Sequence, residues 1–220
     1  MNQSQPETAP KPKEWANPTP AGLVALAVAC FCFFAFLNGF INRTPGESNA
    51  MPLMGCWLLG GFVIQIVVAL LDLRAGNAPG GNTFLYFCSF FMLVSGMEFL
   101  LKSFVPGLDT RVDGWAWFAL TLVVWLWTPA FFKSPALLTV VVLALDLALP
   151  FITLMDLKVF SAEFAAVGAP IAAWSLMVSG LSAIYLASAT ILNGAFGKTV
   201  LPNPGPLYKG KPAAAKSIQA

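Results

Sequence analysis

Apolar residues fill six long stretches of this chain, and short polar segments separate them. The stretches are Ala21–Phe40, Met51–Leu73, Phe84–Phe104, Trp115–Phe132, Ala136–Leu154 and Gly168–Leu192. A helix needs about 20 mostly apolar residues to cross the hydrocarbon core of a bilayer. Each stretch therefore predicts a transmembrane helix. Together they predict an all-α membrane protein, a bundle of six transmembrane helices.

Polar segments flank the apolar stretches at both ends. Residues 1–16 are rich in Pro, Lys, Glu and small polar residues, so we expect them to form a disordered cytoplasmic tail. Residues 17–204 would form the six-helix transmembrane domain, and residues 205–220 a cytoplasmic C-terminal tail. No apolar core of a cleavable signal peptide precedes the first stretch, and we expect that stretch itself to direct insertion.

The distribution of Lys and Arg predicts the orientation in the membrane. An even number of crossings places both termini on one side, which would hold Lys11, Lys13, Arg74, Lys133, Lys198, Lys209, Lys211 and Lys216. The opposite side would hold Arg43, Lys102, Arg111 and Lys158. Cytoplasmic segments carry the excess of positive residues. We therefore expect a multi-pass protein of the plasma membrane, or of the cell inner membrane in a bacterium, with both termini in the cytoplasm.

The composition argues against several classes of function. Hydrophobic residues make up 58% of the chain and charged residues only 10%, whereas about a quarter of a soluble domain is charged. The net charge of +2, without a basic patch among aromatic residues, argues against a nucleic-acid partner. The chain has no His, and its four Cys residues lie inside apolar stretches, where Cys behaves as a small apolar residue. We expect no metal, no cofactor and no enzymatic activity, because a nucleophile with a base, or a set of metal ligands, is missing.

A few polar residues lie inside the apolar stretches. Asp146 falls in the middle of the fifth stretch, where a carboxylate costs roughly 2.5–3.5 kcal/mol on insertion scales. It is either a proton-binding site that lines a pathway or a protonated side chain that bonds a neighbouring helix. Glu98 and Lys102 have the i, i+4 spacing of a structural ion pair. Gln65 would form either an interhelical hydrogen bond or part of a polar pore lining.

Small residues recur at helical spacing in the sixth stretch. They are Gly168, Ala172, Ser175, Ser179, Gly180, Ala183 and Ala187. Because helices in lipid associate through close backbone approach, this stripe predicts a helix–helix contact. The pair Gly60-Gly61 in the second stretch predicts the same.

Two segments have the features of a helix start at a membrane surface. Asn17, a favoured N-cap, precedes Pro18, and Pro is tolerated in the first helical turn. We expect Gly80-Gly81-Asn82-Thr83 to form a turn just before the third helix. Free amides at a helix N-terminus favour an anion, so each start is either an ordinary cap or part of an anion pathway.

Three segments carry a family resemblance. Residues 17–23 read Asn-Pro-Thr-Pro-Ala-Gly-Leu, residues 81–84 read Gly-Asn-Thr-Phe, and residues 192–202 read Leu-Asn-Gly-Ala-Phe-Gly-Lys-Thr-Val-Leu-Pro. With Ser-Ala-Ile-Tyr-Leu-Ala at residues 182–187, these segments resemble the signatures of the acetate uptake transporter family, in the same order. The resemblance covers about residues 15–204.

The resemblance implies a homo-hexamer of six-helix protomers, each with its own pore. It implies passage of acetate and related small monocarboxylates, in some members succinate, by proton symport or by anion-channel conduction. The residues that match the family's pathway are Asn17, Pro18, Thr19, Pro20, Asn82, Thr83, Phe84, Ala183, Tyr185 and Asn193. The family's hydrophobic constriction of Phe, Tyr and Leu would fall at Leu26, Met92 and Leu145, so two of its three residues differ here.

The sequence therefore predicts a transporter or channel for small carboxylate anions. A channel for another small solute remains open because Leu26 and Met92 lack the aromatic rings usual in the family. A membrane scaffold without transport activity would use the same small-residue stripes.

Overall fold

We analysed a computed structural model, which describes residues 15–42, 49–105, 107–159 and 161–209. Within these residues six helical segments are long and apolar enough to cross a membrane, as the sequence predicts. The elements are α1 (Thr19–Leu37), α2 (Met51–Arg74), α3 (Ala78–Tyr86), the π-helix η1 (Phe87–Val94), α4 (Ser95–Phe104), α5 (Arg111–Phe131), α6 (Ala136–Asp156) and α7 (Ala162–Phe196). Helices α3, η1 and α4 follow one another without a break and form the third crossing, Ala78–Phe104.

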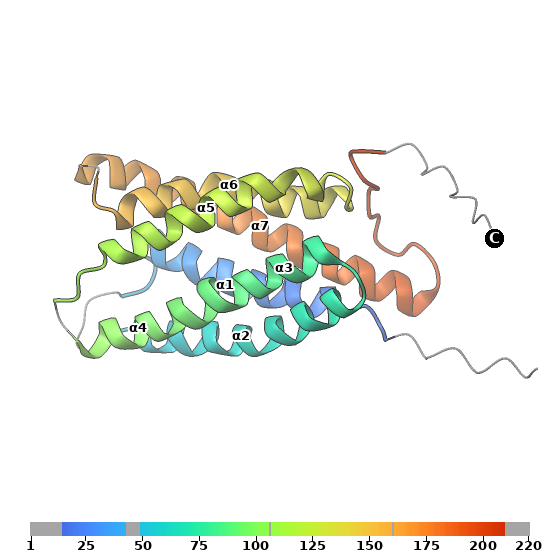
Figure 1. Cartoon of the computed structure of the whole chain (residues 1–220), viewed down its shortest axis with the longest axis horizontal. Coiled ribbons are helices and arrows are strands. Elements are labelled where there is room, and N and C mark those ends of the chain that lie inside the picture. Colours follow the sequence, from blue (N-terminus) through green and yellow to red (C-terminus); the bar gives the residue numbers. More distant parts are fainter. Residues whose placement is uncertain (1–14, 43–48, 106, 160, 210–220) are drawn as a thin grey trace, which may run out of the picture.

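The six crossings lie side by side in one bundle (Figure 1). Helix α2 packs against α3, η1 and α4, and α5 packs against α6. Helices α1 and α7 join these two groups, because α1 contacts α2 and α7, and α7 contacts α6. The start of α1, the α2–α3 turn, the α5–α6 turn and the end of α7 lie at one end of the bundle, which we call the mouth end (Figure 1).

The third crossing begins earlier than the sequence analysis predicts. It starts at Ala78 instead of Phe84, so residues 80–83 lie in a helix and not in a turn. The chain leaves α2 through Gly76, whose φ of +80° favours glycine. Asn77 then caps α3, since its Oδ1 accepts a hydrogen bond from the Gly80 amide at 3.2 Å. The expected turn of residues 80–83 is therefore wrong, and Asn77 is the residue that starts the helix.

The other boundaries differ less. Helix α1 begins at Thr19 and ends at Leu37, and the Oδ1 of Asn17 accepts a hydrogen bond from the Thr19 amide at 3.0 Å. The N-cap position itself is occupied by Pro18, so the prediction that Asn17 is the N-cap is wrong by one residue, although its side chain still accepts a hydrogen bond from the first helical amide. Helix α7 extends beyond the predicted stretch at both ends, from Ala162 to Phe196.

The stripe of small residues on α7 is buried in the bundle, which confirms the predicted helix–helix contact. At Gly180 a Cβ atom would lie 2.8 Å from the Cε1 of Phe31 on α1. This contact is too close for a side chain and explains why glycine is needed here.

The glycine pair on α2 behaves differently at its two positions. A Cβ atom at Gly61 would lie 2.8 Å from the Sδ of Met92 on η1, so Gly61 makes the predicted contact. Gly60 is exposed and has no atom within 4 Å of its Cβ position, so it does not make the predicted contact within the protomer.

An ion-pair cluster lies at the end of the bundle opposite the mouth. The Nζ of Lys102 lies 3.2 Å from Glu98 Oε2, which confirms the predicted i, i+4 pair. The same Nζ lies 2.8 Å from Asp113 Oδ2 on α5. The sequence analysis did not anticipate this second pair, which ties the third crossing to the fourth.

Candidate functional site

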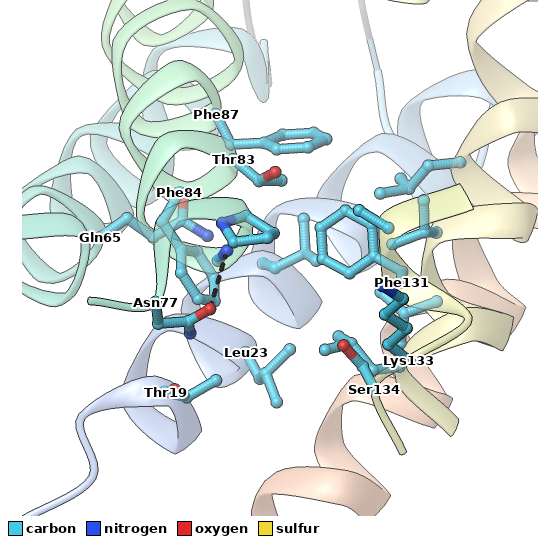
Figure 2. A pocket seen from close by; sticks show the side chains of 18 of the residues that line it. Thr19, Leu23, Gln65, Asn77, Thr83, Phe84, Phe87, Phe131, Lys133 and Ser134 are labelled. Atoms are coloured by element: carbon cyan, nitrogen blue, oxygen red, sulfur yellow. Dashed lines mark hydrogen bonds between the residues drawn. The ribbon is translucent and has the colours of Figure 1, made fainter. Parts of the chain in front are cut away.

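A cavity of about 530 Å³ opens at the mouth end between the two groups of helices. Its walls are mostly apolar: Leu23, Leu26, Phe84, Phe87, Phe131, Leu138, Val141, Val142 and Leu145. The polar residues that line it are Thr19, Gln65, Asn77, Thr83, Lys133 and Ser134. Figure 2 shows Gln65, Phe84 and Asn77 on one side of the cavity and Phe131, Lys133 and Ser134 on the other. Five crossings and the turns between them therefore contribute to one site.

Gln65 is a fully buried polar residue of the lining, 0% exposed. Its Nε2 donates a hydrogen bond to the backbone oxygen of Gly22 on α1 at 3.1 Å. Only the amide nitrogen can bond this carbonyl, so the orientation of the amide is fixed. Oε1 is left without a hydrogen-bond partner. The interhelical hydrogen bond expected from the sequence is confirmed, and Gln65 also lines the cavity, whereas its expected part in a pore stays a prediction.

Thr83 lies on α3, one helical turn from Phe87. Its Oγ1 is buried and has no hydrogen-bond partner. Thr83 and Phe84 line the cavity, whereas the exposed Asn82 points its amide back to the Ala78 carbonyl at 2.9 Å. Of the three predicted residues in this segment, two line the cavity and the third forms a hydrogen bond within α3.

A buried carboxylate supports the mouth of the cavity. Asp72, 3% exposed, accepts hydrogen bonds from Thr19 Oγ1 at 3.3 Å and from Asn77 Nδ2 at 3.3 Å. It thereby joins the starts of α1 and α3 to the end of α2. Asp72 and Asn77 were not among the residues predicted for the site. The position of Asp72, an acidic residue at the end of an apolar stretch, could have indicated it.

A second cavity of about 660 Å³ adjoins the mouth and shares Thr19 and Asn77 with the first. It is lined by the predicted residues Asn17 and Pro18 and also by Trp15, Asp72 and Arg74. The Arg74 guanidinium lies 6.0 Å from the centre of the Trp15 ring. Pro20 is buried and lines neither of these cavities.

Leu26, Phe87 and Leu145 line the deep part of the first cavity. At 1.5 Å per residue they lie about 10–14 Å along their helices from the mouth end. Met92, predicted to belong to this group, is 0% exposed and does not line the cavity, because its Sδ packs against Gly61. The structure therefore places Phe87, and not Met92, beside the two leucines.

The predicted residues on α7 lie away from the cavity. Ala183 is 0% exposed and packs inside the bundle. Tyr185 donates a hydrogen bond to the Pro202 carbonyl at 3.0 Å. The Oδ1 of Asn193 accepts hydrogen bonds from the amides of Val200 at 2.6 Å and Leu201 at 3.0 Å. Tyr185 and Asn193 thus hold the chain that follows α7.

That following segment folds over the α5–α6 turn. The Ala136 amide donates to the Pro204 carbonyl at 3.0 Å, and the Tyr208 amide donates to the Phe132 carbonyl at 2.8 Å. The ammonium group of Lys133 lies 5.9 Å from the centre of the Tyr208 ring. Residues 205–209, expected in a tail, thus contact the turn that borders the mouth. The predicted tail of residues 1–16 lies outside the described residues except for Trp15 and Ala16.

Asp146 lies on α6 next to Leu145 but does not line the first cavity. Its Oδ2 accepts a hydrogen bond from Thr128 Oγ1 on α5 at 2.7 Å. Its backbone carbonyl accepts one from the Trp125 indole at 3.0 Å. Pro150, four residues later, has no N–H to donate to this carbonyl. The predicted bond from Asp146 to a neighbouring helix is present, and its predicted role as a proton site stays a prediction.

The fold is found in a known membrane protein. No family model matches the chain, and no curated protein matches it. Among solved structures, the bacterial acetate channel SatP superposes with a TM-score of 0.73 at 23% sequence identity. The alignment covers 86% of this chain and 99% of that protein. The chain therefore shares the six-helix membrane fold of the bacterial acetate channel SatP.

Proposed function

We propose that this chain provides a transmembrane pathway for small monocarboxylates such as acetate. The observation that carries the proposal is the cavity of about 530 Å³ inside a bundle with the fold of an acetate channel. Its apolar walls suit a short alkyl group, and its few polar groups suit one carboxyl group. The family resemblance of three sequence segments supports the same substrate class.

The polar lining suits a carboxyl group that changes its protonation state along the way. Lys133 places a positive charge at the mouth, where it would attract an anion. The Thr83 hydroxyl donates a hydrogen bond to a carboxylate or to the carbonyl of a carboxylic acid. Gln65 Oε1 accepts hydrogen bonds only, so it favours the protonated acid over the anion.

We place the constriction at Leu26, Phe87 and Leu145. These residues line the deep part of the cavity on three different crossings. Phe87 supplies an aromatic ring there, and its neighbour Phe91 packs edge-on against it at 5.6 Å between ring centres. We propose that Met92 supports the constriction without lining it, because its side chain packs η1 against Gly61 on α2.

Radiolabelled acetate uptake into proteoliposomes tests the transport proposal. We expect uptake well above that of empty vesicles, and no difference between the two would refute it. Leu26→Ala removes three carbon atoms from the constriction, so we expect longer monocarboxylates, such as butyrate, to gain relative to acetate. The matched control is Leu126→Ala, because Leu126 on α5 is 78% exposed. An unchanged acetate-to-butyrate ratio in Leu26→Ala would refute the placement of the constriction.

A channel for an uncharged solute is the second candidate. The unpartnered Oε1 of Gln65 favours it, because this oxygen accepts a hydrogen bond from a neutral donor. Acetamide has the shape of acetate, carries an N–H donor and has no charge. If acetamide passes and acetate does not compete with it, the second candidate replaces the first.

The assembly and sidedness remain proposals. We propose a homo-hexamer in the plasma membrane, with one pathway in each protomer and the mouth end facing the cytoplasm. The Lys and Arg distribution supports this orientation, and the family resemblance supports the hexamer.

A further inference from the structure

A second polar group lies behind the wall of the first cavity, between α3, α5 and α6. Asp146 is half-buried, and its Oδ1 has no hydrogen-bond partner. The hydroxyl of Tyr86 on α3 is also buried without a partner, in a side chain that is 8% exposed. Thr128 donates to the other carboxyl oxygen of Asp146 at 2.7 Å. Two polar atoms therefore remain unsatisfied at the depth where lipid surrounds the bundle, which is costly.

The two unsatisfied groups are within electrostatic reach of each other. The Tyr86 hydroxyl and the Asp146 carboxyl interact electrostatically, and no hydrogen bond joins them. Trp127 packs edge-on against the Tyr86 ring, with 6.3 Å between ring centres. The ring of Tyr86 is thus held in place by packing.

A small cavity lies between Tyr86 and the first cavity. Tyr86 and Thr83 both line it, whereas Asp146 does not, and it offers about 10 Å³ of space for water, about what one water molecule requires. Thr83 also lines the first cavity, and its hydroxyl is itself unpartnered. One water here would have the hydroxyls of Tyr86 and Thr83 as polar partners, which is the minimum that buried water needs.

We propose that Asp146 and Tyr86 form a proton-binding site that a single buried water connects to Thr83 on the wall of the permeation cavity. The protonated carboxyl donates a hydrogen bond to the Tyr86 hydroxyl, which donates to the water. When Tyr86 passes its own proton to the water and takes the proton of the carboxyl, the carboxylate left behind accepts a hydrogen bond from the Tyr86 hydroxyl. This inference rests on the proposed transport function for its consequence, but the proton site itself does not.

The charge of Asp146 would act on a permeating anion through the wall. Its neighbour Leu145 lines the cavity, so one layer of side chains separates the carboxyl from an anion held there. For two like charges about 10 Å apart at an effective dielectric constant of about 20, the repulsion changes occupancy by about tenfold. Protonation removes this repulsion, so we expect anion flux to rise as the pH falls.

Other charges near the site are few. Helices α5 and α7 pack against α6, and the remaining titratable side chains on these three helices are Arg111, Asp113, Asp156, Glu163 and Tyr185. Asp113 lies fifteen residues before Thr128, about 22 Å along α5, and Asp156 lies ten residues after Asp146, about 15 Å along α6. Tyr86 is thus the titratable group that directly faces Asp146.

Infrared difference spectroscopy of the purified protein tests the proton site without any flux. Between about pH 9 and about pH 4, a span that covers the titration of buried carboxyls, we expect a carboxylic-acid C=O band to appear. Part of this band should be absent in Asp146→Asn, and that part should shift in Tyr86→Phe, which keeps the ring but removes the hydroxyl. Asp109→Asn is the matched control, because Asp109 is exposed and paired with Arg111 at 2.7 Å. A band that is the same in the wild type and in Asp146→Asn, or whose Asp146 part is unchanged in Tyr86→Phe, would overturn the site.

Anion current in planar bilayers tests its consequence. Methanesulfonate keeps its charge across the pH range, unlike acetate, so only the protein titrates. We expect the wild-type current to rise about tenfold towards low pH, and the Asp146→Asn current to stay high throughout. Equal pH dependence in the two proteins would overturn the control of flux by this site. If no solute passes through the wild type, the proposed function fails, and the infrared result alone decides on the proton site.

Discussion

The hydrogen bond from the Trp125 indole to the Asp146 carbonyl should stabilise the bundle because of a proline. Pro150 cannot donate to the carbonyl four residues before it, so Asp146 needs a donor from outside α6. Trp125 supplies it at 3.0 Å from a side chain that is 48% exposed towards the membrane. Trp125→Phe keeps most of the aromatic surface and removes only the donor. The carbonyl would then be unsatisfied in lipid.

The expected cost can be bounded. Hydrogen bonds between membrane helices contribute on average about 0.6 kcal/mol and at most about 1.7 kcal/mol. We expect Trp125→Phe to lower the free energy of unfolding by about 1 kcal/mol. In a Pro150→Ala background the alanine amide can bond the Asp146 carbonyl, so the same Trp125→Phe change should cost much less. The coupling energy of this double-mutant cycle should be at least about 0.5 kcal/mol.

Unfolding in mixed micelles of dodecyl maltoside and SDS, followed by far-ultraviolet circular dichroism, measures the free energy of unfolding of the four proteins. These are the wild type, Trp125→Phe, Pro150→Ala and the double variant. Trp115→Phe is the matched control, because Trp115 is 66% exposed on the same helix, close to its start. A Trp125→Phe cost that is the same in the wild-type and in the Pro150→Ala background would refute the argument, since the cost would then come from packing and not from the freed carbonyl.

Two further substitutions test the packing of the bundle. Gly180→Ala should lower the free energy of unfolding by about 1–3 kcal/mol, because its Cβ would lie 2.8 Å from the Phe31 ring. Gly60→Ala, at an open position, is the control in the same unfolding assay. An equal loss of stability in both variants would contradict the close contact at Gly180. Lys102→Met should lower stability by about 1–3 kcal/mol, because it leaves Asp113 and Glu98 without their shared cation, and their side chains are only 10% and 26% exposed. The same unfolding assay measures the loss, and an unchanged stability of Lys102→Met would count against a stabilising role of these ion pairs.

The fold was readable from the sequence because length and apolarity suffice to define a membrane crossing. Helix starts were less readable. The apolar stretch begins at Phe84, but Asn77 and Pro79 start the helix among polar residues, where hydropathy carries no signal. The signal that could have located it was the Asn-X-Pro pattern with a preceding Gly.

The candidate site was only partly readable for a related reason. A position inside a helix does not say which neighbour the side chain faces. Leu26 and Leu145 line the cavity, whereas Met92 fills the space above Gly61 and Phe87 takes the lining position. Asn193 and Tyr185 belong to a recognisable motif, but their hydrogen bonds run to residues 200–202 and not to the cavity. Motif residues can thus hold the chain in place as well as contact a solute.

The segment from Val200 to Tyr208 affects the order in which the protein is completed. A ribosome makes this segment after all six crossings, yet its backbone bonds Phe132 and Ala136 on either side of the α5–α6 turn. Lys133 and Ser134, which border the mouth, therefore reach their final surroundings only when synthesis has passed Tyr208. A nascent chain can be fully inserted in the membrane while its mouth is still unfinished. Premature termination within this segment would thus yield a protein that still crosses the membrane but lacks the hydrogen bonds that this segment makes with the α5–α6 turn.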